Sequence, residues 1–146
     1  MFGMIAALVS GALMSIQGVF NTQVTEKTGS WITNTFVQLT GFLVCLCIWF
    51  IKERNMTSFS NLMTVEPKYL LTGGIFGAFI TFTVIMGMSS LVPAKAVMLI
   101  VAAQLIVAYL IEVFGWFGVE KVGFDWMKLL GTLLFLAGIV VFKIRG

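Results

Sequence analysis

The stretch "AAQLIVAYLIEVFGWFG", from Ala102 to Gly118, decides the fold class of this chain. Its polar side chains are one amide, Gln104, one phenol, Tyr109, and one carboxylic acid, Glu112. Apolar residues cover every side of the helix that it would form, whereas strands of membrane barrels alternate apolar and polar residues over about 10 positions. The stretch therefore predicts a helix in a bilayer, and it raises the question of what one acid does there.

The composition extends this prediction to the whole chain. Of 146 residues, 60% are hydrophobic and 10% are charged, and the mean hydropathy is +1.06. A water-soluble domain of this size cannot bury so much apolar surface, whereas lipid accepts it without cost. The sequence therefore predicts a multi-pass protein of the cell (inner) membrane, with the lipid bilayer as its solvent.

Apolar runs separated by short polar breaks predict an all-α protein with a single transmembrane domain over residues 1–146. Most runs are close to the ~20 residues that a helix needs to cross a bilayer. The first run has no Lys or Arg ahead of it and no small-residue cleavage site, so we interpret it as a helix and not as a removed signal peptide. Asp125 is the predicted N-cap of the last helix. The five predicted spans cover about residues 2–20, 31–51, 69–91, 94–117 and 126–142.

Several classes of function lack the residues that they need. Cys45 and Cys47 point about 200° apart on a helix, the chain has no His, and packing is the preferred interpretation of both thiols. No glycine loop for phosphate and no arrangement of nucleophile and base is present, so we expect neither an enzyme nor a cofactor. The net charge of +3 is spread over every polar break, which makes nucleic acid an improbable partner.

The distribution of Lys and Arg predicts an unusual topology. These residues are retained on the cytoplasmic side of short loops, and most membrane proteins show a clear excess on one side. With five spans, one side holds Lys52, Arg54, Lys68, Lys121 and Lys128, and the other holds Lys27, Lys95, Lys143 and Arg145. Five against four favours insertion in both orientations, although a single dominant residue, or weakly counting charges near helix ends, would leave one orientation.

An odd number of helices in two opposite orientations can form an antiparallel homodimer of ten helices, which reproduces the inverted repeats inside many transporters. The partner would be a second copy of the same chain. Small residues that recur every four positions let helix backbones approach closely and support such assembly. These residues are Gly3, Ala7 and Gly11 in the first span, and Gly73, Gly77 and Thr81 in the third.

Four amides in the apolar runs have two interpretations. Gln17 and Asn21 lie four residues apart on one helix face, and Gln38 and Gln104 lie in other spans. They either line a polar pathway for a solute or hold helices together through interhelical hydrogen bonds, each worth well under ~2 kcal/mol. The sequence supports both equally.

The meaning of Glu112 depends on its depth. If the fourth helix continues to Val119, the acid lies about 10 Å below the helix end, where an ionised acid is costly and implies a role. If the helix stops at Gly115, the acid lies within a turn of the headgroups, where water and a neighbouring cation can hold it without functional consequence. We favour the deeper position. Gln104, eight residues earlier, would then face the same interior cavity.

The order of several motifs resembles a known family. These motifs are "QGVFN", "FVQLTGFLV", "GGIFGAF" and "AAQLIVAYLIEVFGWFG", and together they cover nearly the whole chain. They are similar to those of the YdcZ-type small membrane proteins of the drug/metabolite transporter superfamily. Ala103 and Glu112 stand where that family usually has Gly and Asp. The resemblance implies half-transporters of five helices that act as dual-topology chains, opposed pairs or fused ten-helix forms.

Together these features favour a transporter subunit that moves a small polar or charged solute by alternating access, with proton exchange at Glu112. An acid among amides suits an organic cation, because no Lys or Arg accompanies it deep in the apolar runs. The alternatives are one half of a heterodimeric transporter and an assembly or scaffold subunit that transports nothing. A channel ranks last, because no filter motif or ring of charges is present.

Overall fold

The computed structural model describes residues 1–52 and 56–144. Arg54 and Arg145, two of the cations counted above, lie outside the described residues. The described residues form helices and short connections, with no strand among them, so the predicted all-α fold class is confirmed. The helices are α1 (Phe2–Thr28), α2 (Ser30–Lys52), α3 (Met56–Met63), the 3-10 helix η1 (Lys68–Thr72), α4 (Gly73–Ser90), α5 (Pro93–Phe114), the 3-10 helix η2 (Trp116–Gly118) and α6 (Trp126–Ile144).

Four helical segments are long and apolar enough to cross a membrane. They are Phe2–Thr28, Ser30–Lys52, Lys68–Ser90 and Pro93–Phe114. The apolar part of α6, Trp126–Phe142, is shorter. A helix crosses the hydrocarbon with about 17 to 25 residues, so α6 lies at the lower end of that range and a fifth crossing stays a prediction.

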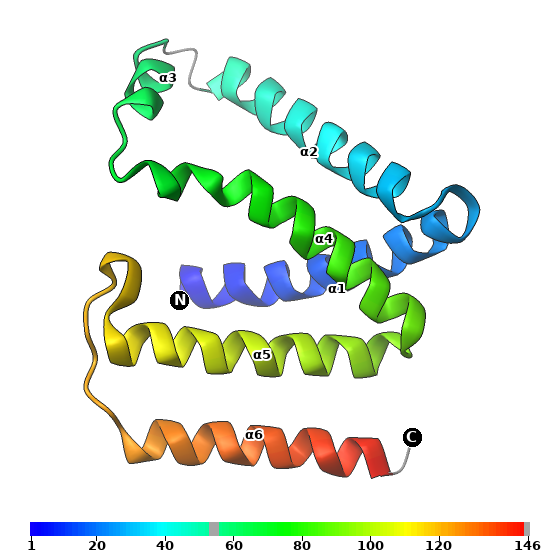
Figure 1. Cartoon of the computed structure of the whole chain (residues 1–146), viewed down its shortest axis with the longest axis vertical. Coiled ribbons are helices and arrows are strands. Elements are labelled where there is room, and N and C mark those ends of the chain that lie inside the picture. The colour runs from blue at the N-terminus through cyan, green and yellow to red at the C-terminus, as the bar shows by residue number, and fades with distance from the viewer. Residues whose placement is uncertain (53–55, 145–146) are drawn as a thin grey trace. The chain divides into compact units, whose positions relative to one another are not determined.

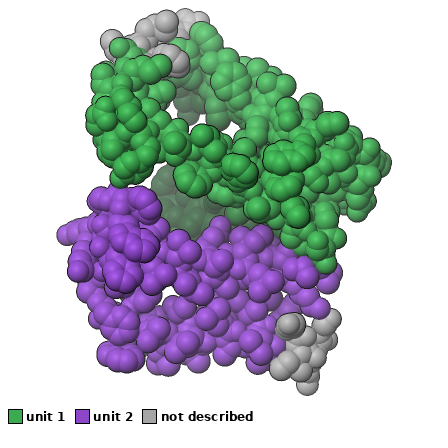
Figure 2. Space-filling model, in the orientation of Figure 1, with its two compact units in different colours: residues 1–90 green, residues 91–146 purple. Residues whose placement is uncertain are grey.

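The chain divides into two compact units, residues 1–90 and residues 91–146 (Figure 2). In the N-terminal unit, α1, α2 and α4 contact one another. In the C-terminal unit, α5 and α6 run side by side and are joined by the connection that contains η2 (Figure 1).

The first helix is longer than its apolar run. We predicted an end near residue 20, but α1 continues to Thr28 because polar residues end a hydrophobic run without ending a helix. The hydroxyls of Thr22 and Thr28 each donate to the carbonyl four residues earlier, which lets them sit in a helix. Gly29 then stops α1 with φ 88° and ψ 154°, a conformation that essentially only glycine adopts.

The helix that carries the acid is shorter than predicted. We expected it to reach residue 117, but α5 ends at Phe114. Gly115 takes a left-handed conformation with φ 68°, and its N–H donates to the Ile111 carbonyl at 2.8 Å. Apolar residues continue beyond this point, so hydropathy alone could not place the end. The short helix α3 was not predicted either.

The core of the N-terminal unit is small and partly polar. Ile85 and Met88 of α4 are buried, and so are the side chains of Asn21, Thr33 and Asn34. A Cβ on Gly18 of α1 would lie 2.5 Å from the Met88 sulfur, so only glycine allows this close approach without a shift of that side chain. Most large apolar side chains face outward, which is the arrangement expected where lipid or a second protein chain is the solvent.

Candidate functional site

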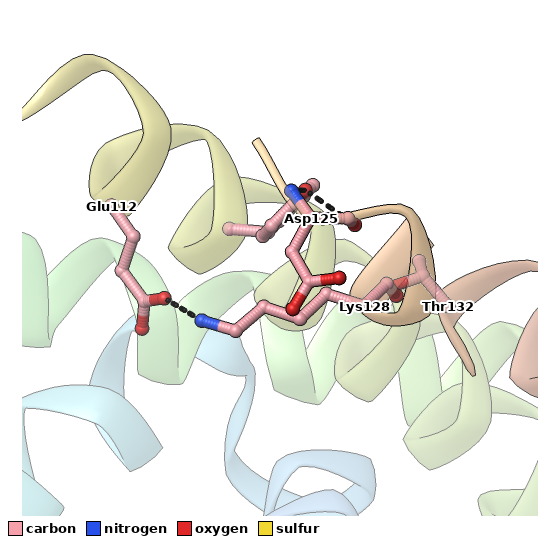
Figure 3. A network of polar contacts seen from close by, with 5 residues as sticks. Glu112, Asp125, Lys128 and Thr132 are labelled. Carbon is pink, nitrogen blue, oxygen red and sulfur yellow. Dashed lines mark hydrogen bonds and ion pairs between the residues drawn. The ribbon is translucent and has the colours of Figure 1, made fainter. Parts of the chain in front are cut away.

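An ion pair joins the two helices of the C-terminal unit. The Nζ atom of Lys128 on α6 donates to Oε2 of Glu112 on α5 at 3.1 Å. Figure 3 shows the two side chains pointing toward one another from facing helices. Both side chains are a little over two-fifths exposed, at 44% for Lys128 and 42% for Glu112. The pair therefore remains accessible from outside the chain.

The connection between α5 and α6 sets the register that brings these charges together. Asp125 caps α6, because its Oδ1 accepts from the Met127 N–H at 2.8 Å; this confirms the predicted cap. The Val122 N–H donates to the Glu112 carbonyl at 3.0 Å. The Tyr109 hydroxyl donates to the Asp125 carbonyl at 3.2 Å and accepts from the Asp125 N–H at 3.3 Å. Hydrogen bonds to α5 thus hold the connection at two residues, Val122 and Asp125.

A cavity of about 320 Å³ adjoins the ion pair. It has apolar walls, two charged groups and two hydroxyl-bearing residues. Its lining consists of Leu105, Ala108, Tyr109, Glu112, Lys128, Gly131 and Thr132. The cavity therefore combines apolar surface with a convergent polar cluster, which is the usual make-up of a small-molecule site.

The position of Glu112 corrects two expectations. The acid lies two residues before the end of α5, or about 3 Å along the helix axis, and not the 10 Å that we favoured. The expected organic cation depended on an acid without a basic companion, and Lys128 is such a companion. Two aromatic pairs lie in the same stretch of chain: Phe114 stacks on Trp116, and Phe124 meets Trp126 edge to face. Aromatic side chains gather at the headgroup level of membrane proteins, so a position of Glu112 near that level is now the prediction.

A second polar surface follows α1 in the N-terminal unit. An open groove along α1, lined by residues of this one helix, contains both amides that the sequence placed on one helix face, Gln17 and Asn21. Gln17 is exposed, whereas Asn21 is 8% exposed. The complete lining is Ala6, Val9, Ser10, Leu13, Met14, Ile16, Gln17, Phe20 and Asn21.

The other two predicted amides lie elsewhere. The Nε2 atom of Gln38 on α2 donates to the Thr81 hydroxyl on α4 at 3.2 Å, and that hydroxyl donates to the Gly77 carbonyl at 3.0 Å. Gln104 is exposed on α5 and is absent from the lining of the cavity beside Glu112 within the described part of the chain. The structure thus brings Gln17 and Asn21 together, and it connects Gln38 to α4.

Most of the small residues predicted for packing face open space within the single chain, whereas Thr81 accepts a hydrogen bond from Gln38 of α2. A Cβ added to Gly3, Gly11, Gly73 or Gly77 would meet nothing within 4 Å, and Ala7 is exposed. The close approach inside the chain occurs at Gly18, which we did not single out. Packing at the predicted positions therefore stays a prediction about contacts between chains.

Asn34 is a polar core residue that the sequence analysis missed. Its side chain is 3% exposed, and its Nδ2 donates to the Ala78 carbonyl of α4 at 2.9 Å. Because a carbonyl can only accept, this contact fixes the amide orientation and leaves Oδ1 buried without a hydrogen-bond partner in the described residues. One signal was available, since Asn34 lies four residues before Gln38 and both face α4.

Lys128 was counted for topology but not recognised as the partner of Glu112. The signal for it was the antiparallel return of the chain: the predicted cap at Asp125 starts the last helix, which places residue 128 one turn into it. Glu112 lies at the corresponding distance before the turn. Among residues 1–52 and 56–144, no group of three or more His, Cys, Asp or Glu could hold a metal ion.

These features define a class of protein: a helical, multi-pass membrane protein that places neutral polar side chains between its helices and an ion pair near one helix end. A comparison with protein families narrows the class. Residues 2–141 match the family described as "Putative inner membrane exporter, YdcZ", so the chain belongs to this family and is a multi-pass protein of the inner membrane. The predicted resemblance is confirmed. Comparison with curated proteins and with solved structures gives no match.

Proposed function

We propose that this protein is a subunit of a small-solute exporter that works by alternating access. The match to an exporter family over residues 2–141 is the observation that carries this proposal. The groove on α1 supports it, because the amide of Gln17 is exposed there to a polar solute, next to the largely buried amide of Asn21. Polar side chains within membrane helices typically face protein or a water-filled pathway.

We further propose that the working unit is an antiparallel homodimer of dual-topology chains. A single chain leaves the groove on α1 open and its small-residue stripes uncovered. A second copy of opposite orientation would cover both and create the pseudo-symmetric halves that alternating access uses. The near-even distribution of Lys and Arg gives the reason why one gene product would supply both orientations.

The proposal includes proton exchange at Glu112, with Lys128 as the partner of the ionised acid. A proton on Glu112 would remove the charge that holds the lysine, so it would loosen the contact between α5 and α6 at this end. Transport would then alternate between a paired and an unpaired state. The competing role is a structural clasp, which Glu112→Gln separates: loss of proton-driven flux with an intact dimer supports coupling, and unchanged flux supports the clasp.

Orientation tests the architecture without knowledge of the substrate. A reporter fused after Gly146 should appear on both sides of the membrane, because the charge distribution gives little preference. Two or three Lys added to one end should bias the population and reduce activity until an oppositely biased copy is supplied. A reporter confined to one side would exclude the dual-topology homodimer and favour a heterodimer.

Solute flux in reconstituted vesicles tests the transporter itself. Gln17→Leu or Asn21→Leu should reduce flux while the protein still assembles, if these amides contact the solute. Gln23→Leu is the matched control, because Gln23 is an amide of the same helix outside the groove. Equal losses of assembly and flux would identify the amides as interhelical contacts, and wild-type protein without flux of any solute would favour a scaffold subunit.

A further inference from the structure

We propose that the cavity between α5 and α6 binds a small zwitterion, with its ammonium group on Glu112 and its acid anion on Lys128. This inference deepens the proposed function, on which it rests for the claim that the bound molecule is also transported. The chemical class includes free amino acids and lipid headgroups that carry an amine and a phosphate. Two sources are therefore possible, and the experiments below distinguish them.

The charge of the site selects the zwitterion. Glu112 and Lys128 are 3.1 Å apart and together carry no net charge. A monovalent cation that binds Glu112 would displace the lysine and leave it without its partner, and an anion on Lys128 would do the same to the acid. A buried or half-buried charge without a partner is costly, especially near lipid. A zwitterion replaces the single ion pair by two, so each charge keeps a partner.

The geometry leaves hydrogen-bonding capacity for such a ligand. The pair uses one of three ammonium hydrogens and one of two carboxylate oxygens. Both side chains line the adjoining cavity of about 320 Å³, which lies at the lower end of the ~300 to 1,000 Å³ typical of small-molecule sites. Tyr109 and Thr132 also line the cavity, but their hydroxyls already donate to the carbonyls of Asp125 and Lys128. The site thus offers a small molecule the remaining ammonium hydrogens of Lys128 and the second carboxylate oxygen of Glu112.

The surroundings of the site suit a charged ligand. The ion pair lies near the end of α5, beside a cavity with apolar walls, and both side chains are partly exposed. Apolar walls lower the local dielectric, so the charges of a ligand in the cavity interact more strongly than in bulk water. A second ion pair in the chain, Glu66 with Lys68, has the same length of 3.1 Å but joins residues two apart in sequence, with side chains 69% and 58% exposed. It provides a matched control.

Equilibrium binding to the purified full-length protein tests the charge selectivity. The probes are glycine as zwitterion, methylammonium as cation and acetate as anion, and isothermal titration calorimetry measures their binding. Wild-type protein should bind glycine about tenfold or more tightly than either ion. Lys128→Gln should shift the preference to methylammonium, and Glu112→Gln should shift it to acetate. Lys68→Gln should leave the wild-type order unchanged.

A structural clasp would not produce this reversal of preference. The same order of probes in all variants, or wild-type protein that binds neither glycine nor an amine-bearing lipid, would overturn the proposal. If the single variants fold poorly, the exchanged pair Glu112→Lys with Lys128→Glu supplies a second test. This double variant should recover both folding and the preference for glycine, and recovery of folding alone would identify a clasp.

The lipid composition separates the two sources of ligand. Nanodiscs of phosphatidylethanolamine and of phosphatidylglycerol differ in whether the headgroup carries an amine. Competition of phosphatidylethanolamine with glycine in wild-type protein, and its loss in Lys128→Gln, would assign the site to a headgroup. Glycine binding that is equal in both lipids would assign it to a free solute.

Flux measurements separate failure of this inference from failure of the proposed function. Glycine binding with the expected selectivity but no flux of any solute would support the site and contradict the exporter. Flux of another solute by wild-type protein that binds neither glycine nor phosphatidylethanolamine would support the exporter and contradict the zwitterion site.

Discussion

The two units of this protein differ in the kind of polar side chain that they contain and in where they place it. The N-terminal unit places neutral polar side chains inside its helix contacts, where Asn21, Thr33 and Asn34 are buried. The C-terminal unit places an acid and a base, Glu112 and Lys128, at one end of a helix pair, where both stay partly exposed. A membrane chain therefore accepts neutral amides between helices, and it keeps charges where a partner and water can reach them.

Free energy explains the difference. The amide of Asn34 donates to a backbone carbonyl on another helix, and such a bond recovers most of what the group loses on leaving water. An ionised acid in the same position would cost roughly 2.5 to 3.5 kcal/mol even on a lenient scale. At the end of α5, Glu112 is 42% exposed as well as paired with Lys128, and this partial exposure avoids most of that cost.

The largest expected effect comes from moving a charge into the neutral unit. Asn34→Asp places a carboxylate opposite the Ala78 carbonyl and should destabilise the N-terminal unit by about 3 kcal/mol or more. Hydrogen exchange of the backbone amides of α1, α2 and α4 in detergent measures the stability of this unit. Asn34→Leu is the control and should cost about 1 kcal/mol or less, because it also removes the unpaired Oδ1. Equal effects of the two variants would contradict the comparison.

The second-largest expected loss of stability comes from a larger side chain at the point where α1 and α4 approach each other closely. Gly18→Leu should destabilise the N-terminal unit by about 1 to 3 kcal/mol, since its side chain would meet Met88 and Val84. Gly11→Leu places the same side chain on the same helix in open space and should leave the unit as stable as wild type. If Gly11→Leu also abolishes the dimer in cross-linking, the stripe that contains Gly11 faces another chain. A dimer unaffected by Gly11→Leu would remove this support for assembly.

A smaller effect concerns the cap that starts α6. Asp125→Ala removes the acceptor of the Met127 N–H and should lower the stability of the C-terminal unit by about 1 kcal/mol. Asp125→Asn keeps an oxygen in this position and should retain most of the stability. Hydrogen exchange of the first turn of α6 measures both variants. Equally fast exchange in Asp125→Asn and Asp125→Ala would show that the charge of Asp125, and not its oxygen acceptor, matters here.

The smallest expected effect on stability comes from the ion pair itself. Lys128→Gln should change the unfolding free energy by about 0.2 to 1 kcal/mol, because both side chains are partly exposed and exposed pairs contribute little. Thermal unfolding of the purified protein followed by circular dichroism measures this change. A loss larger than that of Asp125→Ala would mean that the pair is buried in the assembled protein. The two units would then differ less than the single chain suggests.

Much of the fold was predictable because the bilayer imposes it. Long apolar runs have few solutions other than helices in lipid, so the class and the approximate positions of four spans followed from composition alone. Helix ends were harder, since they depend on single residues. Asp125 was recognised as a cap, but the left-handed conformation of Gly115 leaves no trace in hydropathy, and the depth of Glu112 depended on it.

Individual residues of the candidate site could be singled out from the sequence, but the contacts between residues of different helices could not. Gln17 and Asn21 share a helix face, and helix periodicity alone brings them together. Glu112 and Lys128 belong to different helices, and their contact requires the register of the intervening connection. That register depends on backbone hydrogen bonds such as the one from the Val122 N–H to the Glu112 carbonyl. No pattern of side chains in the sequence specifies these bonds.

The one-residue connection at Gly29 limits the positions at which this chain can gain or lose a residue. A single residue separates α1 from α2, and the hydroxyls of Thr28 and Thr33 bond across it at 2.9 Å. One inserted residue would rotate α2 by about 100°, which would carry Thr33 away from Thr28 and Asn34 away from α4. The connection from Gly115 to Asp125 has several residues in which to absorb the same insertion. A library of single-residue insertions should therefore yield active proteins at residues 119–121 and none at residue 29. Length differences among descendants of this chain should likewise accumulate at residues 119–121 and not at residue 29.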